Sequence, residues 1–179
     1  RFRTMAAEGR DLGGEARLID AMAARNSRIL DAGCGPGRVG ALLHAAGHTV
    51  VGVDVDPVLI DAAIADHPGP EWIVGDLAEL DLADHRAAGG FDVIVSAGNV
   101  MAFLAPSTRR VVLERLRDHL AVDDRLVTGF QAGRDYDFDE FFDHAAAVGL
   151  VVDLRLATWD LRPSTPEADF LVAVFSTDT

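Results

Sequence analysis

The sequence predicts an α/β fold in which helices cover both faces of a mixed, seven-stranded sheet. Three observations carry this prediction. From Arg28 onward, short apolar runs alternate with amphipathic helical patterns, as in a parallel sheet with right-handed crossovers. Glycines crowd residues 33–37, directly after the first apolar run, where a strand turns into a helix. The last two apolar runs have no helix between them, so the final strand must be antiparallel.

The first half of the chain begins with a helix and then alternates strand with helix. Leu18, Ile19 and Met22 recur at helical spacing, which predicts a helix within 13–24 that packs on the sheet. The following elements are a strand over 28–32, a helix over 37–46, a strand over 49–54, a helix over 57–66, a strand over 71–75 and a helical turn over 79–88. Asp56 is expected to cap the helix over 57–66, with Pro57 at its first position.

The second half continues the alternation until the final pair of strands. Its predicted elements are a strand over 91–97, a helix over 106–121, a strand over 125–130, a helix over 137–148 and strands over 150–158 and 169–176. Gly149 can cap the last helix. Residues 162–166 join the last two strands and are too few for the crossover that a parallel return needs.

Length and composition are those of one globular domain, with 179 residues of which 49% are hydrophobic. We expect a single domain over 1–179, with an N-terminal helical segment over 1–27 and the core of the fold over 28–179. No apolar run is long enough for a membrane helix, and the start of the chain is too polar for a signal peptide. We therefore expect a cytoplasmic protein with no membrane partner.

Charge and cysteine content argue against two classes of partner. A nucleic-acid-binding protein needs a basic patch, whereas this chain has a net charge of −13. We interpret its closest group of basic residues as the solvated face of one amphipathic helix. These residues are Arg109, Arg110, Arg115 and Arg117. A single cysteine, Cys34, excludes an internal disulfide, and the absence of a Cys/His cluster predicts no metal site.

The glycine-rich loop is suited to close contact with a ligand. Gly33, Gly35 and Gly37 follow Asp31, which stands near the end of the first strand. Glycine can turn at positive φ and bring backbone N–H groups to a ligand, and the next helix presents its own unpaired N–H groups there. A carboxylate at this place suits a ligand with an ammonium or sulfonium group better than the pyrophosphate of a dinucleotide.

The same loop also satisfies a different motif. Gly35, Gly37 and Gly40 match the dinucleotide fingerprint G-x-G-x-x-G, and Asp54 stands about twenty residues beyond. An NAD-type oxidoreductase is therefore an alternative, although the sequence shows no recognisable proton donor and leaves no length for a separate catalytic domain.

The register of the loop, Asp-Ala-Gly-Cys-Gly-Pro-Gly over 31–37, resembles the D-x-G-x-G-x-G motif of the class I S-adenosylmethionine-dependent methyltransferases. Segments 50–54, 72–77 and 91–97 resemble the next three strands of that family, in order and one βα unit apart. The resemblance implies a Rossmann-like three-layer sandwich and S-adenosylmethionine as the cofactor.

The resemblance also implies which residues bind the cofactor. The three loop glycines would hold its methionine part with Asp31 near the ammonium, Asp54 the ribose, and Asp76 with Leu77 the adenine. Ala97 would line the methyl side. The implied cofactor-binding residues are Asp31, Gly33, Cys34, Gly35, Gly37, Asp54, Val55, Asp76, Leu77 and Ala97.

The sequence identifies no catalytic residue. Methyl transfer depends mainly on alignment and desolvation, and a base is needed only when the acceptor must lose a proton. Residues 96–101 lack the Asn/Asp-Pro-Pro-aromatic motif, which disfavours methylation of amides and exocyclic amines. A non-catalytic cofactor-binding subunit of a larger complex is therefore a further alternative.

A small-molecule acceptor fits the chain best, since no inserted substrate domain interrupts the late strands. We expect a monomer or a homodimer. Candidates for acceptor contacts lie in the loops after the fourth, fifth and sixth strands, where such contacts are usually built. They are Asn99, Arg134, Tyr136 and Trp159.

Overall fold

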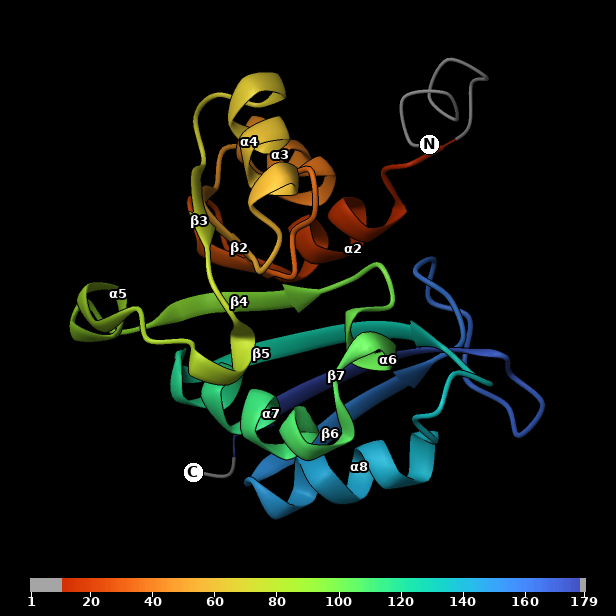
Figure 1. Ribbon diagram of the computed structural model, residues 1–179. Helices are drawn as coiled ribbons and strands as arrows, with labels where there is room; N and C mark the ends of the chain where they lie inside the picture. The colour runs from red at the N-terminus through yellow and green to blue at the C-terminus, as the bar shows by residue number, and fades with distance from the viewer. Residues whose placement is uncertain (1–10, 178–179) are drawn as a thin grey trace.

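The computed structural model describes residues 11–177, which form one seven-stranded sheet with helices on both faces (Figure 1). The strands are β1 (Arg28–Ala32), β2 (Thr49–Asp54), β3 (Glu71–Val74), β4 (Phe91–Ser96), β5 (Leu120–Gln131), β6 (Leu150–Leu156) and β7 (Phe170–Thr177). The helices are α2 (Gly14–Met22), α3 (Arg38–Ala45), α4 (Pro57–Asp66), α5 (Ala83–Ala87), α6 (Val100–Phe103), α7 (Arg109–Asp118) and α8 (Phe138–Ala147). The remaining elements in the described residues are two short 3₁₀ helices, η1 (Leu77–Glu79) and η2 (Pro106–Thr108).

The strand order is β3-β2-β1-β4-β5-β7-β6. β1 is parallel to both β2 and β4, with Leu30 opposite Val51 on one side and Ile94 on the other. The chain runs outward in opposite directions from β1 and from β4, so their carboxyl ends flank the crevice in which open α/β sheets bind ligands. β7 is antiparallel to β5 and β6, which confirms the prediction for the final strand.

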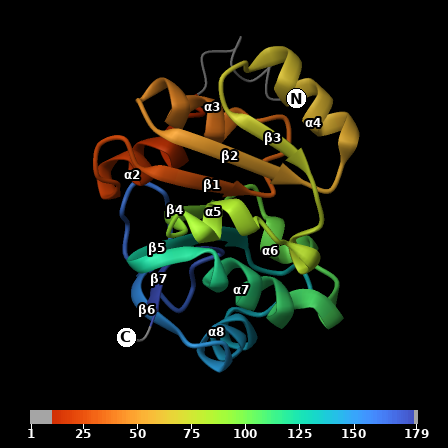
Figure 2. The same cartoon turned by 90° about the vertical axis from the view of Figure 1, so that its left-hand side faces the viewer.

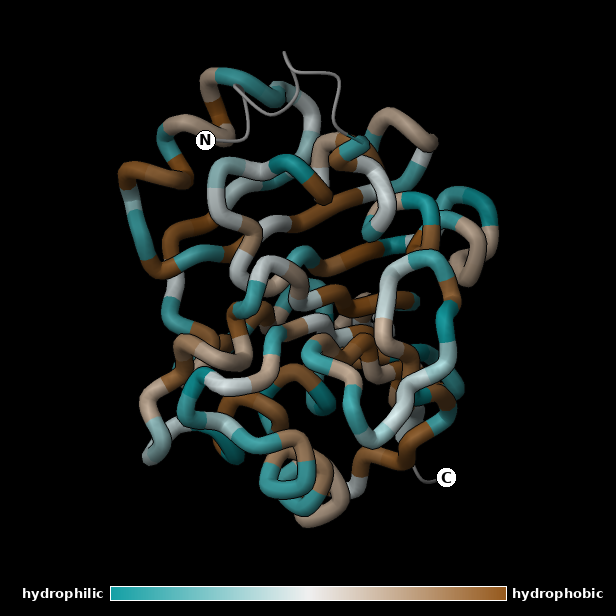
Figure 3. The backbone as a smooth tube through the Cα atoms, turned by 90° about the vertical axis from the view of Figure 1, so that its right-hand side faces the viewer, coloured by the Kyte–Doolittle hydropathy of each residue, from teal (hydrophilic) through white to brown (hydrophobic). Residues whose placement is uncertain are grey.

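Two apolar cores lie on the two faces of the sheet, because successive strand residues point to opposite sides. Leu30 is fully buried in the core that also holds Leu113 of α7 and Phe141 of α8. Its neighbour Ile29 is fully buried in the other core, which contains Leu43 of α3. Figure 2 shows α2 and α3 at one end of the molecule and α7 and α8 at the other, and Figure 3 shows apolar segments along the central strands.

The sequence predicts the strands and long helices well but misplaces several ends. Asp56 caps α4 as expected, accepting the Val58 N–H at 2.9 Å. The helix predicted over 106–121 splits into η2 and α7, and its last residues join β5, since Leu120 pairs with Phe91. The helical turn predicted over 79–88 is divided between η1 and α5. The prediction omits α6 because four residues make one turn, too few to show a period.

One prediction about α7 is wrong. Arg109 does not belong to a solvated face, because its side chain is only 4% exposed. The segment after β5 folds over the start of α7, so the guanidinium carbon lies 4.2 Å from the Tyr136 ring centroid. Arg109 also donates a hydrogen bond to the backbone carbonyl of Asp135, and its Nη1 is 3.4 Å from Glu140 Oε1.

No helix within residues 11–177 has both the length and the apolar character that a bilayer crossing requires.

Candidate functional site

The glycine-rich loop between β1 and α3 has the left-handed backbone that its sequence predicts. Gly33, Gly35 and Gly37 have φ values of 78°, 55° and 86°. A Cβ on Gly33 would lie 2.5 Å from Val100 Cγ2, whereas a Cβ on Gly35 would meet nothing within 4 Å. Gly33 therefore lets α6 approach the loop, and Gly35 borders open space.

Other glycines near the loop make room for a side chain. A Cβ would come within 2.9 Å of the Trp72 ring at Gly40 and within 2.3 Å of it at Gly52. Trp72 comes from β3, and its indole N–H donates to the His67 carbonyl at 2.9 Å. The third glycine of the dinucleotide fingerprint therefore serves packing, so its presence does not support an NAD site.

Asp31 is a buried carboxyl group with an unusual environment. It is 2% exposed, and its Oδ2 accepts the Gly40 N–H at 2.9 Å. Burial raises the pKa of Asp31 to about 7, and the negative charge of Asp54 adds to this effect, although the Gly40 bond and Arg38 oppose it. A ligand cation beside Asp31 would restore its ionised form.

Two further carboxylates stand at or just beyond the ends of neighbouring strands. Asp54 ends β2, where its Oδ2 accepts the Gly35 N–H at 2.8 Å and its Oδ1 accepts the Asp56 N–H at 3.0 Å. These bonds hold the glycine loop against β2. Asp76 follows β3 and caps η1 by accepting the Ala78 N–H at 2.8 Å. A carboxylate oxygen has two lone pairs, so both groups keep acceptor capacity for hydroxyl and amino groups.

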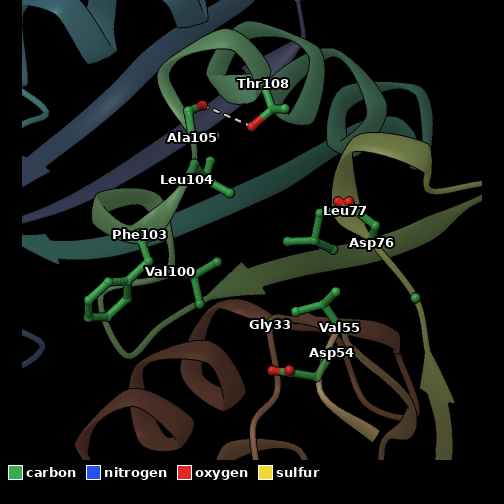
Figure 4. Close-up of a pocket in the computed structure, with 11 residues that line it drawn as sticks. Gly33, Asp54, Val55, Asp76, Leu77, Val100, Phe103, Leu104, Ala105 and Thr108 are labelled. Carbon is green, nitrogen blue, oxygen red and sulfur yellow. Dashed lines mark hydrogen bonds between the residues drawn. The ribbon is translucent and has the colours of Figure 1, made fainter.

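The loop and the carboxylates line two adjoining cavities. One, of about 390 Å³, is the pocket drawn in Figure 4 and is lined in part by Gly33, Asp54, Val55, Asp76 and Leu77. The other is about 500 Å³. Its lining includes Asp31, Gly33, Cys34, Gly35, Asp54 and Ala97. Because Gly33 and Asp54 belong to both, the cavities form one cleft, and every predicted cofactor-binding residue except Gly37 lines it.

The wall of the cleft that faces the glycine loop comes from α6 and the residues after it, none of which is among the predicted cofactor-binding residues. Val100 and Phe103 of α6 line both cavities, and Leu104, Ala105 and Thr108 line the smaller one. Figure 4 shows these side chains coming from α6 and the turn that follows it. Arg38 also lines the larger cavity, and its Nη2 lies 2.7 Å from Glu15 Oε1 of α2. The one feature of the sequence that indicates this role of Arg38 is its position at the start of α3, directly after the glycine-rich loop.

Cys34 behaves as a small packed side chain. Its thiol is buried, and burial raises its pKa, with the charges of Asp31 and Asp54 acting in the same direction. A thiol with a raised pKa is a poor nucleophile at neutral pH. Within residues 11–177, no group of three or more histidine, cysteine or acidic side chains is placed to hold a metal ion.

The acceptor candidates fall in different environments. Asn99 precedes α6 with φ of 65°, and its Oδ1 accepts the Gln131 N–H at 2.8 Å. Arg134 is exposed, and its guanidinium carbon lies 5.4 Å from the centroid of the Phe103 ring. These two candidates therefore lie beside the α6 wall of the cleft.

Tyr136 and Trp159 do not lie at the rim of the cleft. Tyr136 is 1% exposed, stacks near Phe130 and forms a 2.8 Å hydrogen bond with His144. Trp159 is half-buried against β5, since a Cβ on Gly129 would lie 2.2 Å from its ring. Both of these acceptor candidates pack inward on the sheet and its helices, and neither lines the cavities of the cleft.

A family described as "Methyltransferase domain" matches residues 29–123. Among solved structures, a TehB-like SAM-dependent methyltransferase from Corynebacterium glutamicum is 48% identical, with a TM-score of 0.94, over 99% of this chain and 95% of that one. The CcbJ methyltransferase from Streptomyces caelestis is 19% identical over 92% of this chain and 94% of that one, with a TM-score of 0.80, and shares the fold.

Curated relatives match over shorter stretches. The magnesium-protoporphyrin O-methyltransferase of Rhodobacter capsulatus is 37% identical over 102 residues, which cover 53% of this chain and 42% of that protein. A mouse 18S rRNA (guanine-N(7))-methyltransferase is 36% identical over 53 residues, which cover 30% of this chain and 19% of that protein. The chain therefore spans less than half the length of these curated relatives.

Proposed function

The chain belongs to the class I S-adenosylmethionine-dependent methyltransferases, and we propose that it methylates a small molecule and works as a single domain over residues 1–179. Within the described residues, the N-terminal segment contains α2 and the Rossmann-like core begins at β1, whereas residues 1–10 of the predicted helical segment and residues 178–179 of the predicted core lie outside the described residues. The NAD-type alternative fails, because the chain belongs to a different family and Gly40 has a packing role.

The chemistry of the cleft fits the cofactor. Asp31 is a buried carboxyl group with a raised pKa, so an adjacent cation would stabilise its ionised form, and we assign it to the ammonium group. Asp54 retains acceptor capacity for the ribose hydroxyls, and Asp76 with Leu77 takes the adenine. Gly33, Cys34 and Gly35 hold the methionine part, Val55 flanks the ribose and adenine, and Ala97 lines the methyl side. Gly37 does not line the cleft, and its part in this proposal is to turn the loop into α3 at φ of 86°.

Bound S-adenosylmethionine supplies a methyl group on a positively charged sulfur, which is already activated as a leaving group. The protein has to orient this group and exclude water from it. Val100 and Phe103 supply apolar surface over the glycine loop for that purpose. No histidine lines either cavity within residues 11–177, so the described part of the cleft has no histidine base. We propose that the acceptor brings a nucleophilic atom that needs little deprotonation, or loses its proton to solvent.

The acceptor is proposed to be small because the surface opposes a nucleic acid. The net charge of −13 repels phosphates, and the match to the rRNA methyltransferase covers only 30% of this chain. β6 and β7 are joined by a loop, with no further helix or sheet between them in residues 157–169. A cytoplasmic location and a monomeric or homodimeric state belong to the same proposal.

The cleft that joins Asp31, Asp54 and Asp76 to the glycine loop is the observation that carries the proposal. Its test is transfer of isotope-labelled methyl from S-adenosylmethionine to three separate fractions of a cell extract, namely small molecules, RNA and protein. Label in the small-molecule fraction, lost with Asp54→Ala and kept with the exposed α4 control Asp61→Ala, is the expected result. Label confined to RNA or protein contradicts the small-molecule acceptor.

A further inference from the structure

An exposed aromatic ring stands at the wall of the cleft. Phe103 is 68% exposed although it lines both cavities. Figure 4 shows its ring and the Leu104 side chain pointing in different directions from the end of α6. Leu104 faces the smaller cavity alone, whereas Phe103 borders the larger one as well. One face of Phe103 is therefore available to a molecule that enters from solvent.

A positive charge accompanies this ring. The guanidinium carbon of Arg134 lies 5.4 Å from the Phe103 centroid, and no carboxylate in residues 11–177 forms an ion pair with Arg134. Several other arginines in residues 11–177 also form no ion pair, so what distinguishes Arg134 is its place beside the Phe103 ring at the cleft. Its fork of N–H donors remains available to an anion.

The segment that carries Arg134 is fixed on both sides. Before it, the Gln131 N–H donates to Asn99 Oδ1 at 2.8 Å. After it, the Asp135 carbonyl accepts a hydrogen bond from the buried Arg109 guanidinium. The backbone that carries Arg134 is thus held beside α6, which lowers the part of the entropic cost of binding that comes from ordering this segment.

We infer that Phe103 and Arg134 form an acceptor-binding surface for a molecule with a flat aromatic part and an anionic group, either carboxylate or phosphate. The aromatic part stacks on Phe103 at the mouth of the cleft, and the anion accepts paired hydrogen bonds from Arg134. This inference rests on the proposed function, because it assigns the acceptor class of the same cleft.

The test is calorimetric titration of the protein saturated with S-adenosylhomocysteine. The probes are 4-hydroxybenzoate and phenyl phosphate, the neutral analogue 4-hydroxybenzamide, and acetate, which has the charge without the ring. We expect at least one aromatic anion to bind at least tenfold more tightly than both the amide and acetate, and the stronger of the two identifies the anionic group.

Arg134→Gln should reduce this preference at least tenfold, and Arg134→Lys should restore part of it, because lysine keeps the charge but not the fork. Arg110→Gln, an exposed arginine on α7, is the matched control and should change nothing. Equal affinity for the anions and the amide, no binding of any probe, or an unaltered preference in Arg134→Gln overturns the inference. Failure to bind S-adenosylhomocysteine would instead count against the proposed function and remove the basis of the inference.

Discussion

Asp31 links cofactor binding to pH. Its pKa is raised to about 7, chiefly by burial, so the carboxyl group is largely protonated at pH 6 and must lose its proton to pair with an ammonium group. We expect the dissociation constant of S-adenosylmethionine to rise as pH falls below 7, by up to about tenfold per pH unit. Calorimetry in two buffers of different ionisation enthalpy should show proton release near pH 6. A dissociation constant that stays level from pH 5 to pH 8 would contradict the assignment of Asp31.

The buried Asp31 carboxyl group also lowers the stability of the folded protein. Its pKa in the folded protein lies above the ordinary aspartate value of 3.8, so folding favours the protonated form, and the cost in folding free energy grows as pH rises from about 4 to 7. Asp31→Asn removes the charge and can still accept the Gly40 N–H. We expect this variant to be more stable than the parent by about 1–3 kcal/mol at pH 8, and by less at pH 5, while binding the cofactor more weakly. Urea unfolding at both pH values measures the difference, and a variant destabilised at pH 8 would refute the prediction.

Gly33 illustrates a different constraint at the residue scale. Alanine there must adopt φ of 78° and place its Cβ 2.5 Å from Val100 Cγ2. Gly47→Ala is the matched control, with φ of 101° and nothing within 4 Å of the Cβ. We expect Gly33→Ala to lose about 1–3 kcal/mol more stability than Gly47→Ala, because only the former displaces α6. If the two variants lose equal stability in thermal unfolding, α6 moves away from the added Cβ without an energetic cost.

At the scale of elements, α6 is held by one residue that precedes it. Asn99 has φ of 65° and accepts the Gln131 N–H, which ties the β4–α6 turn to the end of β5. Asn99→Ala loses both the hydrogen bond and a residue suited to this backbone, at a cost of about 1–2 kcal/mol. Asn99→Gly keeps the conformation and should recover part of the loss.

Because α6 lines both cavities, Asn99→Ala should also weaken binding of S-adenosylhomocysteine severalfold. Denaturant unfolding and calorimetry on the two variants separate the effects. If Asn99→Ala binds as tightly as the parent, the α6 wall is set by packing against Gly33 rather than by Asn99.

The elements also show where sequence patterns stop being informative. Buried parallel strands read as apolar runs, so β1, β2 and β4 are predictable, and the start of α4 follows from Asp56 and Pro57. α6 is too short for a periodic signal, and the early start of β5 depends on pairing of Leu120 with β4. Such features are decided by contacts between distant segments.

At the scale of the whole molecule, strand order brings together residues from four separate loops. The carboxylates of the cleft are predictable because they stand at or near the carboxyl ends of β1, β2 and β3, which lie along one edge of the sheet. The acceptor side is less predictable: Tyr136 points into the core and Arg109 is buried, and both outcomes depend on how the segment after β5 folds over α7. The residue types alone indicate neither the inward position of Tyr136 nor the burial of Arg109.

Calorimetric titration with S-adenosylmethionine, S-adenosylhomocysteine and NAD, on the parent protein, Asp54→Ala and the control Asp61→Ala, tests the central assignment most directly. We expect dissociation constants on the order of micromolar for the two adenosyl ligands, at least tenfold weaker binding in Asp54→Ala, no change in Asp61→Ala and no binding of NAD. Binding of NAD with no response to the adenosyl ligands, or undiminished binding in Asp54→Ala, would contradict it.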